Sequence, residues 1–185
     1  MGEKSQSALW RRLDRPGHDA ALLRPRSDEW LLRGTAAFGH ETGPVSVAYE
    51  VEVDRQWRTR RGAVRGFVGQ RAFDYEILRG AEGWRLNGSL IQGLEGLVDL
   101  DYGFTPATNI LHLRRNAPAS GKRISFPVAW FDLDSASLKE LPQIYERRSD
   151  ETYWYVAPTG PYEGLLEIAP TGFIKTYPGL WRLET

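Results

Sequence analysis

Apolar and polar residues alternate along much of this chain, most regularly over residues 45–57. Successive side chains of a β-strand point to opposite faces, so the alternation predicts one long strand with an apolar inner face and a polar outer face. A shift of one residue would expose the whole apolar set, which fixes the facing. We expect Glu50 and Glu52 to face outward. The side chains expected to face the interior are Val45, Val47, Tyr49, Val51, Val53 and Trp57.

Shorter runs of the same kind recur along the chain and are separated by Gly and Pro. In residues 63–78, Gly66 and Gly69 predict a bulge or a sharp bend. The segment Pro-Thr-Gly at residues 170–172 predicts a hairpin turn between two further runs. The other expected strands are residues 8–13, 20–23, 30–38, 124–130, 153–156, 162–169 and 173–177.

Helical patterns are weak. Residues 134–141 carry the best one, which Pro142 would end, and residues 89–97 carry a shorter one. We therefore expect a mainly β protein: an antiparallel meander of about a dozen strands with one or two short helices. A sheet of that size usually curls or closes because open edges invite aggregation, so we expect a barrel-like body. The length suits one domain that spans residues 1–185.

Composition narrows the classes of function. The formal net charge is zero, so the whole molecule has no field that would steer it to nucleic acid or to an anionic membrane. The absence of cysteine excludes disulfides, thiolate zinc sites and cysteine nucleophiles. The first residues are not followed by the apolar segment of a signal peptide, and no apolar run approaches the ~20 residues of a membrane helix. We expect a cytoplasmic protein without a transmembrane segment.

Motifs of the common enzyme classes do not occur: there is no Gly-x-Ser-x-Gly elbow, no phosphate-binding loop and no His-Glu-x-x-His. His18, His40 and His112 are scattered, so we expect no metal site and no cofactor. Asp99 and Asp101 would point to the same face of a strand, about 6.6 Å apart along it. Such a pair could perform acid–base chemistry on a glycosidic bond. We expect instead that these carboxylates face solvent or pair with arginine.

A basic run without acidic residues covers residues 55–71. Arg58 and Arg60 share one strand face there, where their planar guanidinium groups could grip a phosphate, sulfate or carboxylate. The run could instead form a solvated face that nearby acidic residues balance. Nucleic-acid binding is not expected, because the chain is neutral overall and carries no nucleic-acid motif. The arginines of the run are Arg55, Arg58, Arg60, Arg61, Arg65 and Arg71.

Several segments resemble the bacterial family of putative glycolipid-binding proteins. The most specific is the block Thr-Pro-Ala-Thr-Asn at residues 105–109, within the longer similar stretch 98–109 and shortly before Leu113-Arg114-Arg115. The resemblance implies a curved, largely antiparallel sheet that closes on itself, similar to bacterial lipoprotein carriers. The other similar segments are residues 57–60, 141–145, 153–155 and 172–181.

The leading function is non-catalytic binding of an amphiphilic ligand, and the resemblance implies a glycolipid or a related lipid. A head group needs hydrogen-bond donors and a tail needs apolar walls. The alternative is an enzyme that acts on a sugar or a phosphate-bearing substrate with Asp99, Asp101 and the arginine run. A third hypothesis is an interaction module whose exposed sheet edge pairs with another chain; the oligomeric state stays open. The predicted ligand site consists of Trp57, Arg58, Arg60, Arg114, Tyr153 and Tyr155.

Overall fold

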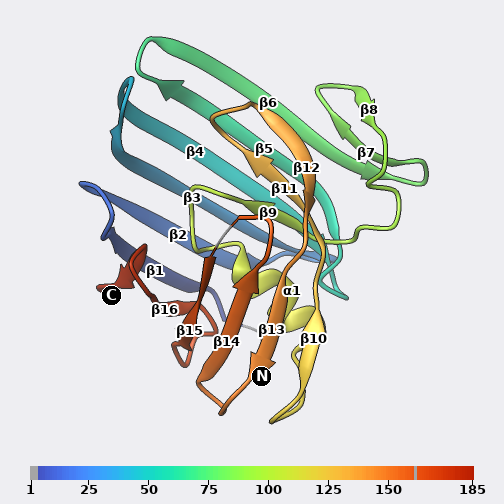
Figure 1. Ribbon diagram of the computed structural model, residues 1–185. Helices are drawn as coiled ribbons and strands as arrows, with labels where there is room; N and C mark the ends of the chain where they lie inside the picture. The colour runs from blue at the N-terminus through green and yellow to red at the C-terminus, as the bar shows by residue number, and fades with distance from the viewer. Residues whose placement is uncertain (1–3, 161) are drawn as a thin grey trace.

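The computed structural model describes residues 4–160 and 162–185, and most of them lie in β-strands (Figure 1). One large antiparallel sheet contains fourteen strands. A smaller sheet and a helix are formed by β9 (Leu100–Tyr102), α1 (Asn109–Asn116), β11 (Val128–Asp132) and β12 (Ser137–Leu141). The strands of the large sheet are β1 (Gln6–Arg12), β2 (Gly17–Pro25), β3 (Glu29–His40), β4 (Gly43–Asp54), β5 (Thr59–Val68), β6 (Arg71–Gly80), β7 (Gly83–Leu86), β8 (Ser89–Ile91), β10 (Arg123–Ser125), β13 (Ile144–Arg147), β14 (Thr152–Ala157), β15 (Tyr162–Ile168), β16 (Ile174–Tyr177) and β17 (Trp181–Leu183).

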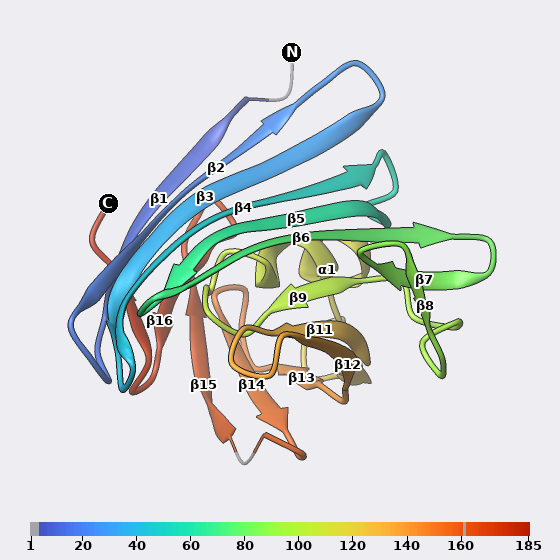
Figure 2. The ribbon, with the colours of Figure 1, turned by 90° about the horizontal axis from the view of Figure 1, so that it is seen from above.

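The large sheet runs in the order β10-β13-β14-β15-β16-β17-β1-β2-β3-β4-β5-β6-β7-β8. Strands β1 and β17 pair with each other in the middle of this order, with Trp10 opposite Leu183. Strands β8 and β10 form its edges, so the sheet curves strongly without closing. Figure 2 shows α1, β9, β11 and β12 within this curve. The expectation of a mainly β, antiparallel, barrel-like body is confirmed, with one helix in the described part of the chain.

Strand β4 follows the predicted alternation as far as Asp54. Glu50 and Glu52 alternate with the inner-face residues and are half-buried, and the Glu52 carboxylate lies 3.4 Å from Nη1 of Arg61 on the neighbouring strand. Strands β3 and β5 pair with the two edges of β4, and its inner face packs within the large core cluster. The inner-face residues, each at most 2 % exposed, are Val45, Val47, Tyr49, Val51 and Val53.

Strand β4 ends before Trp57, which the alternation had placed on the same strand face. The Asp54 carboxylate accepts hydrogen bonds of 2.9 Å from the backbone N–H groups of Gln56 and Arg58 and so closes a tight turn. Within this turn Trp57 has a φ of 62°, outside the strand region. Its ring still packs against the core, stacked on Trp30 with the ring centroids 4.7 Å apart.

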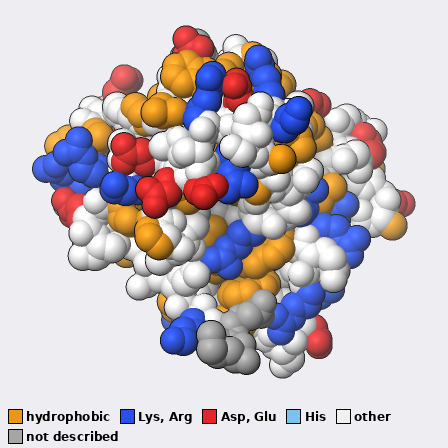
Figure 3. All heavy atoms as spheres, turned by 90° about the horizontal axis from the view of Figure 1, so that it is seen from below, with side chains coloured by type: hydrophobic (Ala, Val, Ile, Leu, Met, Phe, Trp, Pro, Cys, Tyr) orange, Lys and Arg blue, Asp and Glu red, His pale blue; other side chains and the backbone are white. Residues whose placement is uncertain are grey.

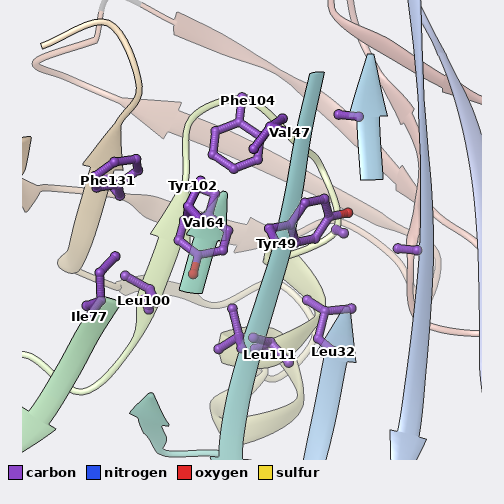
Figure 4. Close-up of a cluster of buried hydrophobic side chains, with 14 of the residues drawn as sticks. Leu32, Val47, Tyr49, Val64, Ile77, Leu100, Tyr102, Phe104, Leu111 and Phe131 are labelled. Atoms are coloured by element: carbon purple, nitrogen blue, oxygen red, sulfur yellow. The ribbon is translucent and has the colours of Figure 1, made fainter. Parts of the chain in front are cut away.

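A large cluster of buried side chains fills the space between the N-terminal strands and the enclosed elements (Figure 4). A second cluster lies against the C-terminal strands and includes Tyr145, Tyr153 and Leu166. Burial of apolar surface at about 25 cal/mol per Å² makes such clusters the main source of stability. The interior next to the N-terminal strands is therefore packed with side chains. Labelled members of the large cluster are Leu32, Val47, Tyr49, Val64, Ile77, Leu100, Tyr102, Phe104, Leu111 and Phe131.

Both segments predicted to be helical are strands and turns instead. Residues 134–141 form the turn after β11 and then β12, because the Asp132 carboxylate accepts a hydrogen bond from the Ser135 hydroxyl and Ala136 adopts a φ of 51°. Residues 89–97 form β8 and turns. The described helix, α1, begins at the end of the Thr-Pro-Ala-Thr-Asn block, where no helix was predicted. No helix in the described part of the chain is long and apolar enough to span a membrane.

Candidate functional site

A cavity of about 520 Å³ opens between the small sheet and the C-terminal strands of the large sheet. Its volume lies in the range of small-molecule sites. The buried lining residues, which we call the floor, are Asp101, Tyr102, Thr105, Asn109, Tyr155, Ala157 and Trp181. The remaining lining residues are partly or fully exposed and form the rim, which includes Gly103, Trp130, Lys139, Glu140, Leu141, Thr159, Tyr162, Tyr177 and Leu180.

Asp101 is the ionisable carboxyl of the floor. It accepts a 2.5 Å hydrogen bond from the Thr108 hydroxyl and a 2.7 Å hydrogen bond from the amide nitrogen of Gln143. Burial raises the pKa of Asp101, although the nearby His112 and these two hydrogen bonds act in the opposite direction. Neutral donors rather than a paired cation hold this carboxyl in place.

Tyr145 joins α1 to β13 next to the floor. Its hydroxyl accepts a 2.8 Å hydrogen bond from Nδ2 of Asn109 and lies 3.0 Å from Nε2 of His112. Burial lowers the pKa of His112, so its ring is neutral at pH 7. Because Asn109 is anchored through its amide nitrogen, its orientation in the floor is fixed.

A wall of tyrosine rings runs from this network to the rim. Centroid distances are 4.8 Å between Tyr145 and Tyr155, 5.8 Å between Tyr155 and Tyr177, and 4.9 Å between Tyr177 and Tyr162. Burial raises the pKa of each hydroxyl, that of Tyr162 to about 12, so all four keep their protons at pH 7. The wall therefore offers a ligand aromatic rings for packing and neutral hydroxyls for hydrogen bonding.

Trp130 on β11 forms another part of the rim. Its ring lies close to Gly103, where an added Cβ would come within 2.6 Å of the ring atom Cζ2. The Lys139 Nζ lies 4.9 Å from the ring centroid of Trp130 and 3.7 Å from Oδ2 of Asp132. The cation of the rim is thus already engaged by a ring and a carboxylate.

A second buried carboxyl, Asp19 on β2, lies behind Thr105 of the floor. The Thr105 hydroxyl hydrogen-bonds to it, and the Tyr49 hydroxyl lies 3.0 Å from both of its oxygens. Gly34 provides the space for this hydroxyl, because an added Cβ would lie 2.3 Å from it. Burial raises the pKa of Asp19 to about 7, although its hydrogen bonds to Thr105, Tyr49 and the backbone of Ala20 lower it. This carboxyl therefore titrates near neutral pH in contact with a floor residue.

The residues predicted from sequence to form one site lie in different surroundings. Tyr155 belongs to the floor, whereas Tyr153 on the same face of β14 is buried in the second cluster. The Arg114 guanidinium carbon lies 4.9 Å from the ring centroid of Trp57, so these two are brought together away from the cavity lining.

The other two predicted residues are exposed arginines. Arg58 donates a 2.8 Å hydrogen bond from Nε to Oδ2 of Asp54, and Arg60 lies on β5. Figure 3 shows one face of the molecule on which basic side chains border exposed hydrophobic ones. No arginine is among the described residues that line the cavity. A ligand site that contains all six residues stays a prediction.

Asp99 and Asp101 have different partners. Arg115 holds Asp99 through Nη2 at 2.7 Å and Nε at 2.9 Å, whereas Asp101 is bonded by neutral groups. Only Asp101 of this pair is among the described lining residues. Within residues 4–160 and 162–185, no group of three or more His, Asp or Glu side chains could hold a metal ion.

A second hollow, of about 790 Å³, lies on the outward face of β1 to β5. It forms because many of the outward side chains there are small, and most of its lining residues are partly or fully exposed. Arg33, Arg61 and Arg65 also line it. Although this hollow is larger, the cavity is the better candidate site because buried polar groups and aromatic rings converge on it. The small outward residues include Ser7, Ala20, Thr35, Ala48 and Ala63.

Most residues of the floor and rim were not among the site residues predicted from sequence. Thr105 and Asn109 belong to the block that carries the family resemblance, and Tyr162 and Tyr177 were predicted only as parts of strands. The segments that carry the family resemblance were the available signal. Residues 98–109, 141–145, 153–155 and 172–181 are far apart in sequence, yet each contributes lining residues to the cavity.

Comparison with known proteins places these features in context. A family model described as putative glycolipid-binding matches residues 7–183. No curated protein matches the chain. The fold is similar to that of a DUF1089 family protein from Pseudomonas aeruginosa in its crystal structure, with a TM-score of 0.76 and 21% sequence identity over 98% of this chain and 93% of that chain. At this identity the similarity concerns the fold alone.

Proposed function

The chain belongs to the family of putative glycolipid-binding proteins, and from this premise we propose that it binds an amphiphilic ligand, such as a glycolipid, without transforming it. The observation that carries the proposal is the cavity of about 520 Å³, which combines a polar floor with aromatic side chains. Concave sites with mostly apolar walls and a few convergent polar groups are typical ligand sites.

The side chains around the cavity match the two requirements of an amphiphile. Trp130, Leu141 and Leu180 offer apolar surface at the rim, whose burial stabilises a complex by about 25 cal/mol per Å². Asp101 and the tyrosine hydroxyls offer hydrogen-bond partners, without which burial of a polar head group would be unfavourable.

An enzyme that uses Asp99 and Asp101 as an acid–base pair has less support. Arg115 forms hydrogen bonds to both oxygens of Asp99, and Asp99 is not among the described lining residues. One carboxyl of the pair is then left to act on a bound molecule. In the proposed function, Asp101 is a hydrogen-bonding partner and no reacting group is required.

Native mass spectrometry of freshly purified protein tests the proposal, because a retained amphiphile would add a defined mass. Isothermal titration with dodecyl maltoside, kept below the concentration at which it forms micelles, tests binding independently. We expect saturable binding with one molecule per chain. The absence of both a retained mass and saturable binding would contradict the proposal.

A matched pair of variants locates the binding site. Thr159→Trp adds a large side chain at the rim of the cavity, and Ala48→Trp adds the same side chain in the outward hollow. We expect Thr159→Trp to weaken dodecyl maltoside binding at least tenfold and Ala48→Trp to leave it within twofold. The opposite result would assign the ligand to the outward hollow.

A further inference from the structure

We propose that the ligand inserts into the cavity with its head group first, and that this head group is uncharged and rich in hydroxyls. The inference rests on the proposed function and adds the orientation and the chemical class of the ligand. Three observations carry it: the distribution of polar groups between floor and rim, the unused hydrogen-bonding capacity of the floor, and the charges of the lining.

Polar side chains that have little access to water lie among the buried lining residues, whereas those of the rim, Lys139, Glu140 and Thr159, are exposed and keep their water. Asp101 is 6 % exposed and Asn109 is 3 % exposed, whereas Trp130, Leu141 and Leu180 are partly exposed rim residues. A hydrocarbon tail inserted first would remove water from Asp101 and Asn109 without replacing its hydrogen bonds, which is costly. A head group inserted first would pair with both and leave the tail against Trp130, Leu141 and Leu180 of the rim.

The floor has capacity for further hydrogen bonds. A carboxylate offers about four acceptor sites. The side chains of Thr108 and Gln143 and the backbone of Tyr102 occupy three of those on Asp101, which leaves one. Asn109 donates one N–H to Tyr145, which leaves its amide oxygen and a second N–H. In a sugar, hydroxyls on neighbouring carbon atoms can each donate and accept a hydrogen bond. A hydroxyl-rich ring therefore suits a carboxyl and an amide that lie side by side.

The charges of the lining select against ionic head groups. An anionic head would meet Asp101 on the floor, while the described lining contains no arginine and Lys139 lies at the rim, engaged by Trp130 and Asp132. A cationic head would require an ionised Asp101, whose charged form burial disfavours. Hydroxyls can pair with this carboxyl in either protonation state.

The orientation has a measurable consequence for tail length. In a tail-first complex each added CH₂ would be buried, and the affinity would rise about fourfold per CH₂. In a head-first complex the affinity gains little once the tail has passed the rim. The dependence of affinity on tail length therefore separates the two orientations without any change to the protein.

Isothermal titration of the wild-type chain, residues 1–185, with hexyl, octyl and decyl β-glucoside tests the orientation. Octyl sulfate and octyltrimethylammonium, with the same tail and a charged head, test the chemical class. We expect octyl glucoside to bind at least tenfold more tightly than both charged probes. We also expect the affinity to rise less than twofold per CH₂ between octyl and decyl glucoside.

Different failures have different meanings. A steady fourfold gain per CH₂, or a charged probe that binds as tightly as octyl glucoside, would overturn the inference and leave the proposed function standing. If no probe with a tail binds, including dodecyl maltoside, the proposed function fails and the inference with it.

A pair of variants tests the role of the floor. Asp101→Asn exchanges a floor carboxyl for an amide, and Glu140→Gln makes the same exchange at the exposed rim. We expect about a tenfold loss of octyl glucoside affinity for Asp101→Asn and less than a twofold change for Glu140→Gln. A folded Asp101→Asn protein with wild-type affinity would overturn the assignment. If that variant does not fold, the tail-length series on the wild-type chain decides.

Discussion

The amide nitrogen of Gln143 lies 2.7 Å from Oδ2 of Asp101, so that the residue before β13 holds a carboxyl on β9. Strand β9 belongs to the small sheet and β13 to the large one. This hydrogen bond therefore connects the two sheets at the floor of the cavity. Gln143 is fully buried, and no hydrogen-bond partner of its Oε1 is found among the described residues.

Replacement of Gln143 by Leu should destabilise the protein by about 1–3 kcal/mol, because it leaves a buried carboxyl short of one donor. Urea denaturation followed by circular dichroism measures this change. Gln70→Leu, at an exposed position, is the control and should change the free energy of unfolding by less than about 0.5 kcal/mol. Equal stabilities of the two variants would show that the hydrogen bond does not hold the sheets together.

The buried Asp19 should make stability depend on pH. Burial raises its pKa from 3.8 to about 7, so the folded state binds a proton that the unfolded state releases. The stabilising contribution is complete below pH 3.8 and is lost as pH rises towards 7, with a slope of up to about 1.4 kcal/mol per pH unit. The free energy of unfolding, measured in urea from pH 4 to 8, should therefore fall less steeply in Asp19→Asn than in the wild-type chain. Asp28→Asn, at an exposed site, should keep the wild-type slope.

Gly103→Ala should displace Trp130, since the new Cβ would come within 2.6 Å of the ring. We expect a loss of about 1–3 kcal/mol in stability, as for other overpacked positions, together with weaker binding of octyl glucoside. The matched control is Gly96→Ala, where an added Cβ meets nothing within 4 Å. An unchanged affinity of Gly103→Ala would mean that Trp130 does not contact the ligand.

Arg58→Gln and Arg60→Gln distinguish the site predicted from sequence from the cavity. Neither residue is among the described lining residues, and both are exposed. If the ligand occupies the cavity, each variant should bind octyl glucoside within twofold of the wild-type affinity and remain folded. A loss of tenfold or more in either would favour the predicted site around Trp57.

The strands were largely predictable because their faces differ in burial. The alternation in β4 identified its five buried hydrophobic residues, and the same reasoning identified the strand that contains Tyr153 and Tyr155. The placement of Trp57 on the same strand was wrong, because the side chain of Asp54 closes a turn that contains it. An alternation of apolar and polar residues does not reveal such a turn. The helix predicted over residues 134–141 is wrong for a similar reason, because the Asp132 carboxylate accepts a hydrogen bond from the Ser135 hydroxyl in a hairpin turn, where Ala136 adopts a positive φ.

The cavity could not be predicted from local pattern. Its floor depends on Asp101, Asn109 and Tyr155, which lie on three elements that meet only when the large sheet curls around the small one. The sequence left two interpretations of the arginine run open: a ligand site, or a solvated face that nearby acidic residues balance. In the structure, the acidic side chains of Asp54 and Asp74 pair with Arg58 and Arg65.

The pairing of β1 with β17 also bears on the order of folding. Every other contact between neighbouring strands from β1 to β8, and from β13 to β17, is made between strands that follow each other in sequence. Those hairpins can form early, because short loops lose little entropy on closure. The β1–β17 seam instead joins residues 10–12 to residues 181–183 and closes the longest loop in the sheet. We therefore expect the two meanders to form separately and to pair with each other last, at this seam. A chain cut before β17 would leave two unpaired strand edges in the middle of the sheet, which would favour aggregation.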